Sequence, residues 1–153
     1  MEKILISSCF LGNKVRYDGG DNLLVNTTLK CWQETDRLVV ICPELAGGLS
    51  TPRAPAEIQL SRNRIIVKTI TGEDVTQAFE LGAQRALSLC RLHGIRYALL
   101  KESSPSCGSS SIYNGEFNQQ KIPGQGVTTA LLRANGVKVF SDNNLLSLIA
   151  ELS

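Results

Sequence analysis

Three of the five cysteines in this chain follow apolar, strand-like runs, and cysteine thiolates are strong metal ligands and nucleophiles. They are Cys9 after the run 4–6, Cys42 after 38–41 and Cys107 after 97–100. Cys107 lies in the sequence Ser104-Pro105-Ser106-Cys107-Gly108, whose proline and glycine fix and bend the backbone. Such a loop can direct free N–H groups at an anion, for example a thiolate, a sulfide or a substrate oxygen.

Three thiolates brought into one small volume repel one another, so a cation is needed to hold them together. One option is Zn²⁺ bound by three cysteines and a water, although the only histidine, His93, is distant in sequence. Another is an iron–sulfur cluster, which normally has four cysteine ligands, so that three would leave one iron open. An open iron acts as a Lewis acid and favours a sulfur ligand. The spacing equally allows three unrelated buried cysteines.

Strand-like and helix-like segments alternate along the chain, which predicts a mostly parallel sheet with helices on both faces. The expected strands are 4–6, 38–41, 97–100 and 137–140, and the expected helices are 26–34, 71–93, 127–135 and 144–152. Segments 57–60 and 64–67 flank a polar turn and predict a β-hairpin. The fold expected is therefore α/β: a single-domain, Rossmann-like three-layer sandwich over 1–153, with a mostly parallel sheet and a short β-hairpin insertion.

In open parallel sheets, ligands bind in the crevice beyond the carboxyl ends of the strands. Each of the three cysteines follows a strand at that end, so this architecture would bring them to one crevice. The loop after 97–100 is expected to extend from Lys101 to Gln125, and loops of that length in a compact domain are usually functional.

Other polar side chains near these cysteines are candidates for site roles. Glu44, two residues after Cys42, could act as a general base on water or be an ordinary loop carboxylate. Ser103, Ser104 and Ser106 could donate hydrogen bonds to a cluster sulfur or a substrate atom, or could be structural. Four further residues are predicted to bind the substrate, and the two arginines among them could bind a carbonyl or an anion: Arg16, Tyr17, Asp18 and Arg53. Either arginine could instead pair with Asp18 or Glu57.

Composition limits the classes of function. The formal net charge of +2 comes from scattered basic residues, which argues against a nucleic-acid partner. No apolar run approaches the ~20 residues that cross a bilayer, and no signal peptide is recognisable, so a cytoplasmic location is expected. The odd number of cysteines argues against a disulfide framework. Cys31 and Cys90 fall in expected helices and are predicted to be core residues, and His93 is predicted to end a helix.

The segment from Cys9 to Arg16 resembles the phosphate loop of low-molecular-weight tyrosine phosphatases. Those enzymes need five residues between cysteine and arginine, so that both groups flank one phosphate. Here six residues intervene, and no serine or threonine follows Arg16. The spacing therefore does not fit that chemistry.

The motifs as a set resemble those of thiouracil desulfidases, small bacterial proteins once catalogued as a domain of unknown function. The resemblance spans nearly the whole chain in the right order. It rests on Cys9 with Gly12 and Arg16-Tyr17-Asp18-Gly19, Cys42-Pro43-Glu44 with Gly47-Gly48-Leu49, Thr51-Pro52-Arg53, Lys101 with Ser104-Pro105-Ser106-Cys107-Gly108, and Gly124-Gln125-Gly126-Val127-Thr128.

The resemblance implies a [4Fe–4S] cluster bound by Cys9, Cys42 and Cys107. It implies conversion of 2-thiouracil, or a related small thiolated pyrimidine, to uracil and sulfide by non-redox replacement of sulfur with oxygen. Glu44 would move protons or activate the attacking water, and Ser104, with Ser103, would orient the substrate or its leaving sulfur. The alternative is a cluster-binding or zinc-binding sulfur carrier or sensor without turnover.

Overall fold

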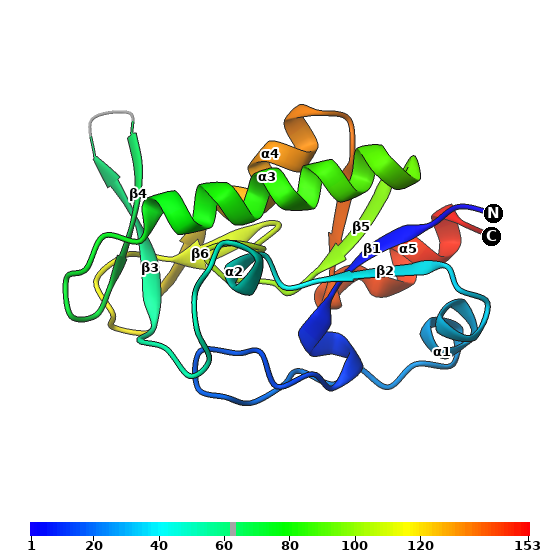
Figure 1. Cartoon of the computed structure of the whole chain (residues 1–153), viewed down its shortest axis with the longest axis horizontal. Helices are drawn as coiled ribbons and strands as arrows, with labels where there is room; N and C mark the ends of the chain where they lie inside the picture. Colours follow the sequence, from blue (N-terminus) through cyan, green and yellow to red (C-terminus); the bar gives the residue numbers. More distant parts are fainter. Residues whose placement is uncertain (62–63) are drawn as a thin grey trace.

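The computed structural model describes residues 1–61 and 64–153, and its centre is a four-stranded parallel sheet (Figure 1). The strand order is β2-β1-β5-β8, with Ile4 of β1 paired to both Leu38 of β2 and Tyr97 of β5. The strands are β1 (Ile4–Ser7), β2 (Leu38–Ile41), β5 (Tyr97–Leu100) and β8 (Lys138–Ser141). All four predicted strands are present, and the last begins one residue later than predicted.

Helices cover both faces of this sheet because its strands are apolar on both sides. Leu5, Ala98 and Leu100 pack towards α3 (Thr76–His93) and α4 (Val127–Ala134). Ile4, Ile6 and Leu99 pack towards α1 (Thr27–Glu34) and α5 (Leu145–Glu151) on the opposite face (Figure 1). All six side chains are fully buried. The predicted Rossmann-like α/β sandwich is confirmed.

Helix ends follow local capping signals. The side chain of Asn26 accepts a hydrogen bond from the N–H of Leu29 at 3.0 Å and begins α1, as predicted. α3 begins at Thr76 rather than at Thr71, because the preceding residues pair with the β-hairpin through the N–H of Val75 and the carbonyl of Val67. It ends at His93, where Gly94 takes the left-handed conformation.

Two β-hairpins lie beyond the carboxyl ends of the parallel strands (Figure 1). The predicted hairpin is formed by β3 (Ala56–Ser61) and β4 (Arg64–Thr69), and the predicted turn residues Arg62 and Asn63 lie outside the described residues. The second hairpin, β6 (Ser111–Tyr113) and β7 (Lys121–Pro123), forms within the long loop and was not predicted. Nor was the short helix α2 (Pro43–Ala46), which follows Cys42.

Burial corrects one cysteine prediction and confirms the other. Cys90 is buried on α3, as predicted, whereas Cys31 is exposed on α1. α1 turns Leu29 and Trp32 towards the sheet, and this leaves Cys31 on the solvent side.

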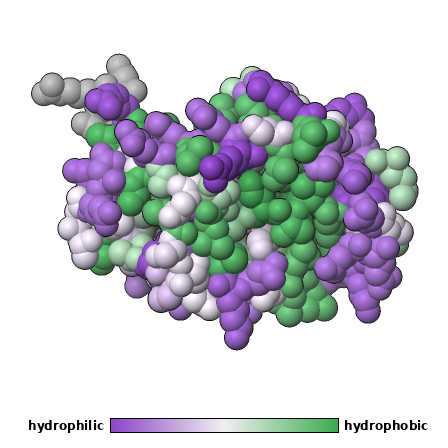
Figure 2. Space-filling model, viewed as in Figure 1, coloured by the Kyte–Doolittle hydropathy of each residue, from purple (hydrophilic) through white to green (hydrophobic). Residues whose placement is uncertain are grey.

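An apolar surface covers β2 and the neighbouring half of α3 (Figure 2). Val40 and Leu92 are exposed there, and β2 is an edge strand of the sheet. Among residues 1–61 and 64–153, no helix is both long enough and apolar enough to cross a membrane.

Candidate functional site

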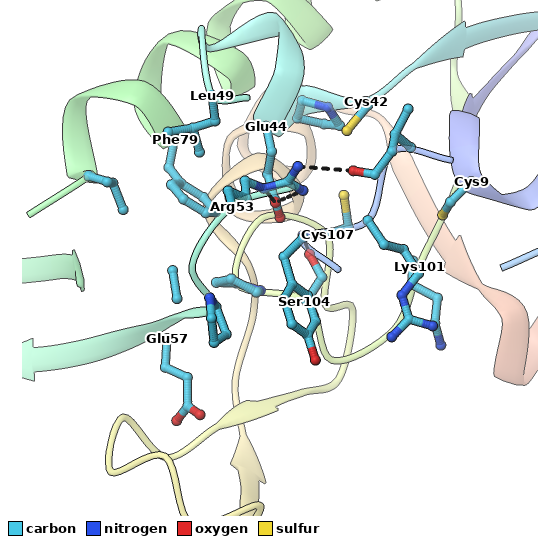
Figure 3. Close-up of a pocket in the computed structure, with 18 of the residues that line it drawn as sticks. Cys9, Cys42, Glu44, Leu49, Arg53, Glu57, Phe79, Lys101, Ser104 and Cys107 are labelled. Carbon is cyan, nitrogen blue, oxygen red and sulfur yellow. Dashed lines mark hydrogen bonds and ion pairs between the residues drawn. The ribbon is translucent and has the colours of Figure 1, made fainter. Parts of the chain in front are cut away.

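A cavity of about 1080 Å³ lies at the carboxyl ends of the parallel strands. β1 has β2 on one side and β5 on the other, so the connections leave it in opposite directions and open a crevice there. The cavity wall includes Cys9, Cys42 and Cys107 (Figure 3). Its volume is at the upper end of the range for small-molecule sites, which leaves room for a bound group and a small substrate together.

Each of the three cysteines reaches the cavity from a different element. Cys9 lies in a short 3₁₀ turn directly after β1, Cys42 is the residue before α2, and Cys107 lies in the loop after β5. All three are free thiols. Figure 3 shows their sulfur atoms around the same part of the cavity. The fold therefore gathers three cysteines that are far apart in sequence.

Burial and neighbouring groups raise the pKa of all three cavity thiols. Burial raises the pKa of Cys9, and the neighbouring Cys42 raises it further. Burial also raises the pKa of Cys42, and the neighbouring Glu44 raises it further. Burial raises the pKa of Cys107 to about 12, with further contributions from Glu44 and the other two cysteines. Burial therefore holds all three thiols in the protonated form, and a cation that binds them must displace their protons.

The spacing of the three thiols bears on which cation fits. Within the described residues, no group of three or more His, Cys, Asp or Glu side chains is placed to hold a single metal ion. The predicted alternative of one Zn²⁺ bound by three cysteines therefore lacks the required geometry, and His93 does not line the cavity. A cluster binds each cysteine through a different iron, so its ligands lie further apart. Cys9, Cys42 and Cys107 are the three thiols of the cavity wall that could hold such a group.

α2 fixes the position of both Cys42 and Glu44. It packs so closely against α3 that a Cβ atom at Gly82 would lie 1.9 Å from the carbonyl oxygen of Pro43. A Cβ at Gly47 would lie equally close to the backbone of α3. Only glycine permits this approach, and it sets the N-terminus of α2 at the cavity wall.

Arg53 holds the carboxylate of Glu44. Its Nε donates to Glu44 Oε2 at 2.8 Å, and its Nη2 donates to the same oxygen. Nη1 donates to the carbonyl of Val15 at 3.0 Å. Arg53 therefore pairs with neither Asp18 nor Glu57, the partners considered from the sequence. Both bonds reach Oε2, so Oε1 is left for a ligand in the cavity.

The N–H groups of the loop around Cys107 form hydrogen bonds within the loop itself. The hydroxyl oxygen of Ser104 accepts the N–H of Ser106 at 3.1 Å and of Cys107 at 2.9 Å, and the N–H of Gly108 donates to the Ser104 carbonyl at 2.9 Å. The expectation that these N–H groups point freely at an anion is wrong. The two bonds instead orient Ser104, which lines the cavity, and leave its hydroxyl hydrogen to donate.

The other two predicted serines have different positions. Ser103 lines the cavity, and its hydroxyl is paired with that of Ser111 at 2.9 Å. The hydroxyl of Ser106 is buried away from the cavity against Thr128, at 2.7 Å. Ser106 therefore supports the loop, and this position corrects its prediction as a substrate-binding residue.

The residues predicted after Cys9 are only partly at the site. Arg16 and Tyr17 line the cavity, whereas Asp18 does not. Asp18 is exposed and forms an ion pair with Arg16 at 3.2 Å. Asp18 was predicted to bind substrate, but the structure places it outside the cavity wall.

Lys101 is a charged residue of the cavity wall that was given no role from the sequence. Lys101 lies beside Cys9 and Cys107 (Figure 3), and its Nζ donates to Asp142 at 2.8 Å. Its positive charge helps to lower the pKa of Cys9 against the larger, raising effect of burial. Lys101 directly follows the buried strand β5, and this position could have indicated from the sequence that it lies at the site.

Glu102, next in sequence, was also missed. Burial alone would raise the pKa of this carboxyl, but hydrogen bonds from the Ser109 hydroxyl and from the N–H groups of Ser110, Ser109 and Ser111 together outweigh burial and lower the pKa to about 2. The carboxylate is therefore charged at all ordinary pH values.

This depressed pKa predicts an acid-sensitive contribution to stability. Because the folded pKa lies below the ordinary value of 4.5, the stabilisation is present above that pH and is lost as the pH falls towards about 2. We expect the gap in free energy of unfolding between the wild type and Glu102→Gln to shrink by roughly 3 kcal/mol over this window. Denaturant titrations at several pH values measure it, and a pH-independent gap would contradict the prediction.

Comparisons with known proteins agree with this geometry. The family model for 2-thiouracil desulfurase matches residues 4–144. The protein YbbK of Bacillus subtilis (strain 168) is 41% identical over 148 residues, covering 93% of this chain and 97% of the relative. A solved structure described as a [4Fe–4S]-dependent thiouracil desulfidase, TudS, is 49% identical with a TM-score of 0.94, covering 99% of this chain and 98% of that one.

Proposed function

The chain belongs to the 2-thiouracil desulfurase family, and from this premise we propose that it is a desulfidase acting on 2-thiouracil or a related small thiolated pyrimidine. The reaction breaks the C=S bond of the substrate and forms a C=O bond with oxygen from water. The products are uracil and sulfide, so no net redox change takes place. The observation that carries this proposal is the set of three free cysteines at one cavity beside the Glu44 carboxylate.

Cys9, Cys42 and Cys107 would hold a [4Fe–4S] cluster, the group on which the similar desulfidase depends. When bound, a cluster with three protein ligands supplies an open iron that polarises a thiocarbonyl through its sulfur. Three free cysteines that line one cavity support this assignment, because they supply the thiolate ligands that such a cluster takes from a protein.

The chain's own side chains would then move protons and orient the substrate. Glu44 accepts a proton from the attacking water through Oε1, while Arg53 holds the carboxylate in place through Oε2. Ser104 donates its hydroxyl hydrogen to the substrate or its departing sulfur, and Ser103 supports the loop beside it. Arg16 and Tyr17 form the wall against which the pyrimidine packs.

An anaerobic assay tests this proposal. Protein purified without air is analysed for iron and acid-labile sulfide, then incubated with 2-thiouracil while uracil and sulfide are measured. We expect about four irons per chain and release of both products in equal amounts. Cluster without product would favour the alternative of a sulfur carrier or sensor, and absence of iron would contradict the proposal.

Arg53 gives a separate prediction. In Arg53→Lys, a single ammonium replaces the guanidinium that donates twice to Glu44, so the carboxylate loses its fixed orientation. We expect turnover to fall roughly tenfold or more while iron content is unchanged, because Arg53 is not a cluster ligand. Arg91→Lys, on the exposed end of α3, is the control. Turnover equal to that of this control would remove Arg53 from the mechanism.

Three further features belong to the same proposal. Segments spread along the chain from Ser7 to Lys121 contribute to one cavity, so we treat 1–153 as a single cluster-binding domain. Five free cysteines suit a reducing compartment, and we place the protein in the cytoplasm. The net charge of +2 favours a small-molecule substrate over a nucleic acid.

A further inference from the structure

The loop that carries Cys107 is closed by one buried carboxylate. Oε1 of Glu102 accepts the N–H groups of Ser109 at 2.7 Å, Ser110 at 3.0 Å, and Ser103 and Ser111 at 3.2 Å. Oε2 accepts the hydroxyls of Ser109 and of Ser110, the latter at 3.2 Å. These bonds join the two ends of the loop on either side of Ser104 and Cys107.

Only a charged acceptor suits this position. Glu102 is 5% exposed, and among the described residues no cation lies within ion-pair distance of it. Four N–H groups converge on a single oxygen, and bonds to an ionised acceptor are stronger than bonds to a neutral one. A glutamine of the same length would offer a neutral oxygen to these donors and place an N–H₂ group in the same enclosed space.

The loop depends on this closure more than the other cysteine-bearing segments do. Cys9 and Cys42 are held by a 3₁₀ turn and by the start of α2, whereas Cys107 lies outside any helix or strand. On its far side the loop contacts α4, where the Thr129 hydroxyl donates to the Cys107 carbonyl at 2.9 Å. A Cβ at Gly126 would lie 2.4 Å from the Ser106 backbone, so α4 approaches the loop as closely as a chain can. α4 is thus one support of the loop, and Glu102 is the other.

We propose that Glu102 is a positioning residue whose carboxylate holds Cys107 and Ser104 at the cavity before any cluster binds. The identity of the bound group rests on the proposed function, but the closure of the loop does not. The loop is preorganised in this way, so the free energy of binding is not spent on ordering it.

Thiol alkylation of the cluster-free chain tests this role. Full-length protein is stripped of iron with a chelator without air, treated with iodoacetamide, and analysed by mass spectrometry for the rate at each cysteine. In Glu102→Gln we expect Cys107 to react at least about tenfold faster than in the wild type, because lost bonds to a charged acceptor raise the open population of the loop. The rates at Cys9 and Cys42 should change by less than about twofold, and they serve as internal references.

Glu57→Gln is the matched control. Glu57 is also buried, and it accepts the N–H groups of Gly115 at 2.9 Å and Phe117 at 3.3 Å, in a loop without a cysteine. This variant should leave the Cys107 rate unchanged. An unchanged Cys107 rate in Glu102→Gln, or equal acceleration in both variants, would overturn the proposal.

A second readout uses the loaded protein. Iron should leave Glu102→Gln faster than the wild type in the presence of a chelator, and an equal rate of loss counts against the role. If Glu102→Gln does not fold by circular dichroism, the double variant Ser109→Ala/Ser110→Ala takes its place under the same alkylation criterion, because it removes only the hydroxyl donors to Oε2. If the wild type binds no iron, the proposed function fails, while the alkylation rates still decide the role of Glu102.

Discussion

Iron content is expected to fall from about four atoms per chain to fewer than about one when Cys107 is replaced by serine. A serine hydroxyl is a hard, protonated oxygen at neutral pH and is a poor substitute for a thiolate on iron. Two remaining cysteines leave too few protein ligands to retain a cluster. The thiol of Cys107 is buried, so solvent cannot easily supply a replacement ligand at that position.

The control for this variant is Cys31→Ser, which changes an exposed cysteine on α1 outside the cavity. It should keep full iron content and turnover. Both proteins are purified without air and compared by iron analysis, acid-labile sulfide and visible absorbance. Full iron retention in Cys107→Ser would show that another group completes the site and would remove Cys107 from the ligand set.

The regular elements of the fold were largely predictable from sequence because each carries a strong local signal. The strand at 97–100 is apolar on both faces, and the helix after Asn26 has a good cap. The short helix α2 was not predictable in this way. Its four residues are held by the close approach of Gly47 and Gly82, a tertiary contact between segments that are distant in sequence.

The cysteines of the site were more predictable than the residues that support them. The three could be brought together from the predicted parallel sheet alone, because parallel strands place their carboxyl ends on one edge. Hydrogen-bond partners could not be assigned in the same way. Ser104 and Ser106 flank Pro105. The hydroxyl of Ser106 nevertheless faces Thr128, whereas Ser104 lines the cavity. Glu102 reads in sequence as an ordinary loop carboxylate, and only the folded loop shows four N–H groups directed at it.

Arg53 illustrates why charge pairing was the least predictable feature. The sequence offers several carboxylates as partners, and the choice depends on how the loop from Thr51 to Pro55 passes the cavity. The structure places the guanidinium on Glu44 and on the carbonyl of Val15, so it links α2 to the segment after Cys9. This link makes the Glu44 carboxylate part of the cavity wall.

Glu44→Gln should therefore separate cluster binding from turnover. The amide has nearly the shape of the carboxylate and can still accept from Arg53, so packing beside α2 is preserved. It cannot accept a proton from water, and loss of a general base typically lowers turnover by about 10²–10⁴-fold. We expect iron content and visible absorbance to match the wild type while sulfide release from 2-thiouracil falls by that factor.

Glu80→Gln, on the exposed face of α3, removes a carboxylate of the same kind outside the cavity and should leave turnover unchanged. Product is measured as uracil and sulfide under anaerobic conditions, with single-turnover mixing to separate chemistry from product release. A variant that loses its iron would assign Glu44 to cluster binding. A variant that retains both iron and full turnover would show that the proton is taken by another group.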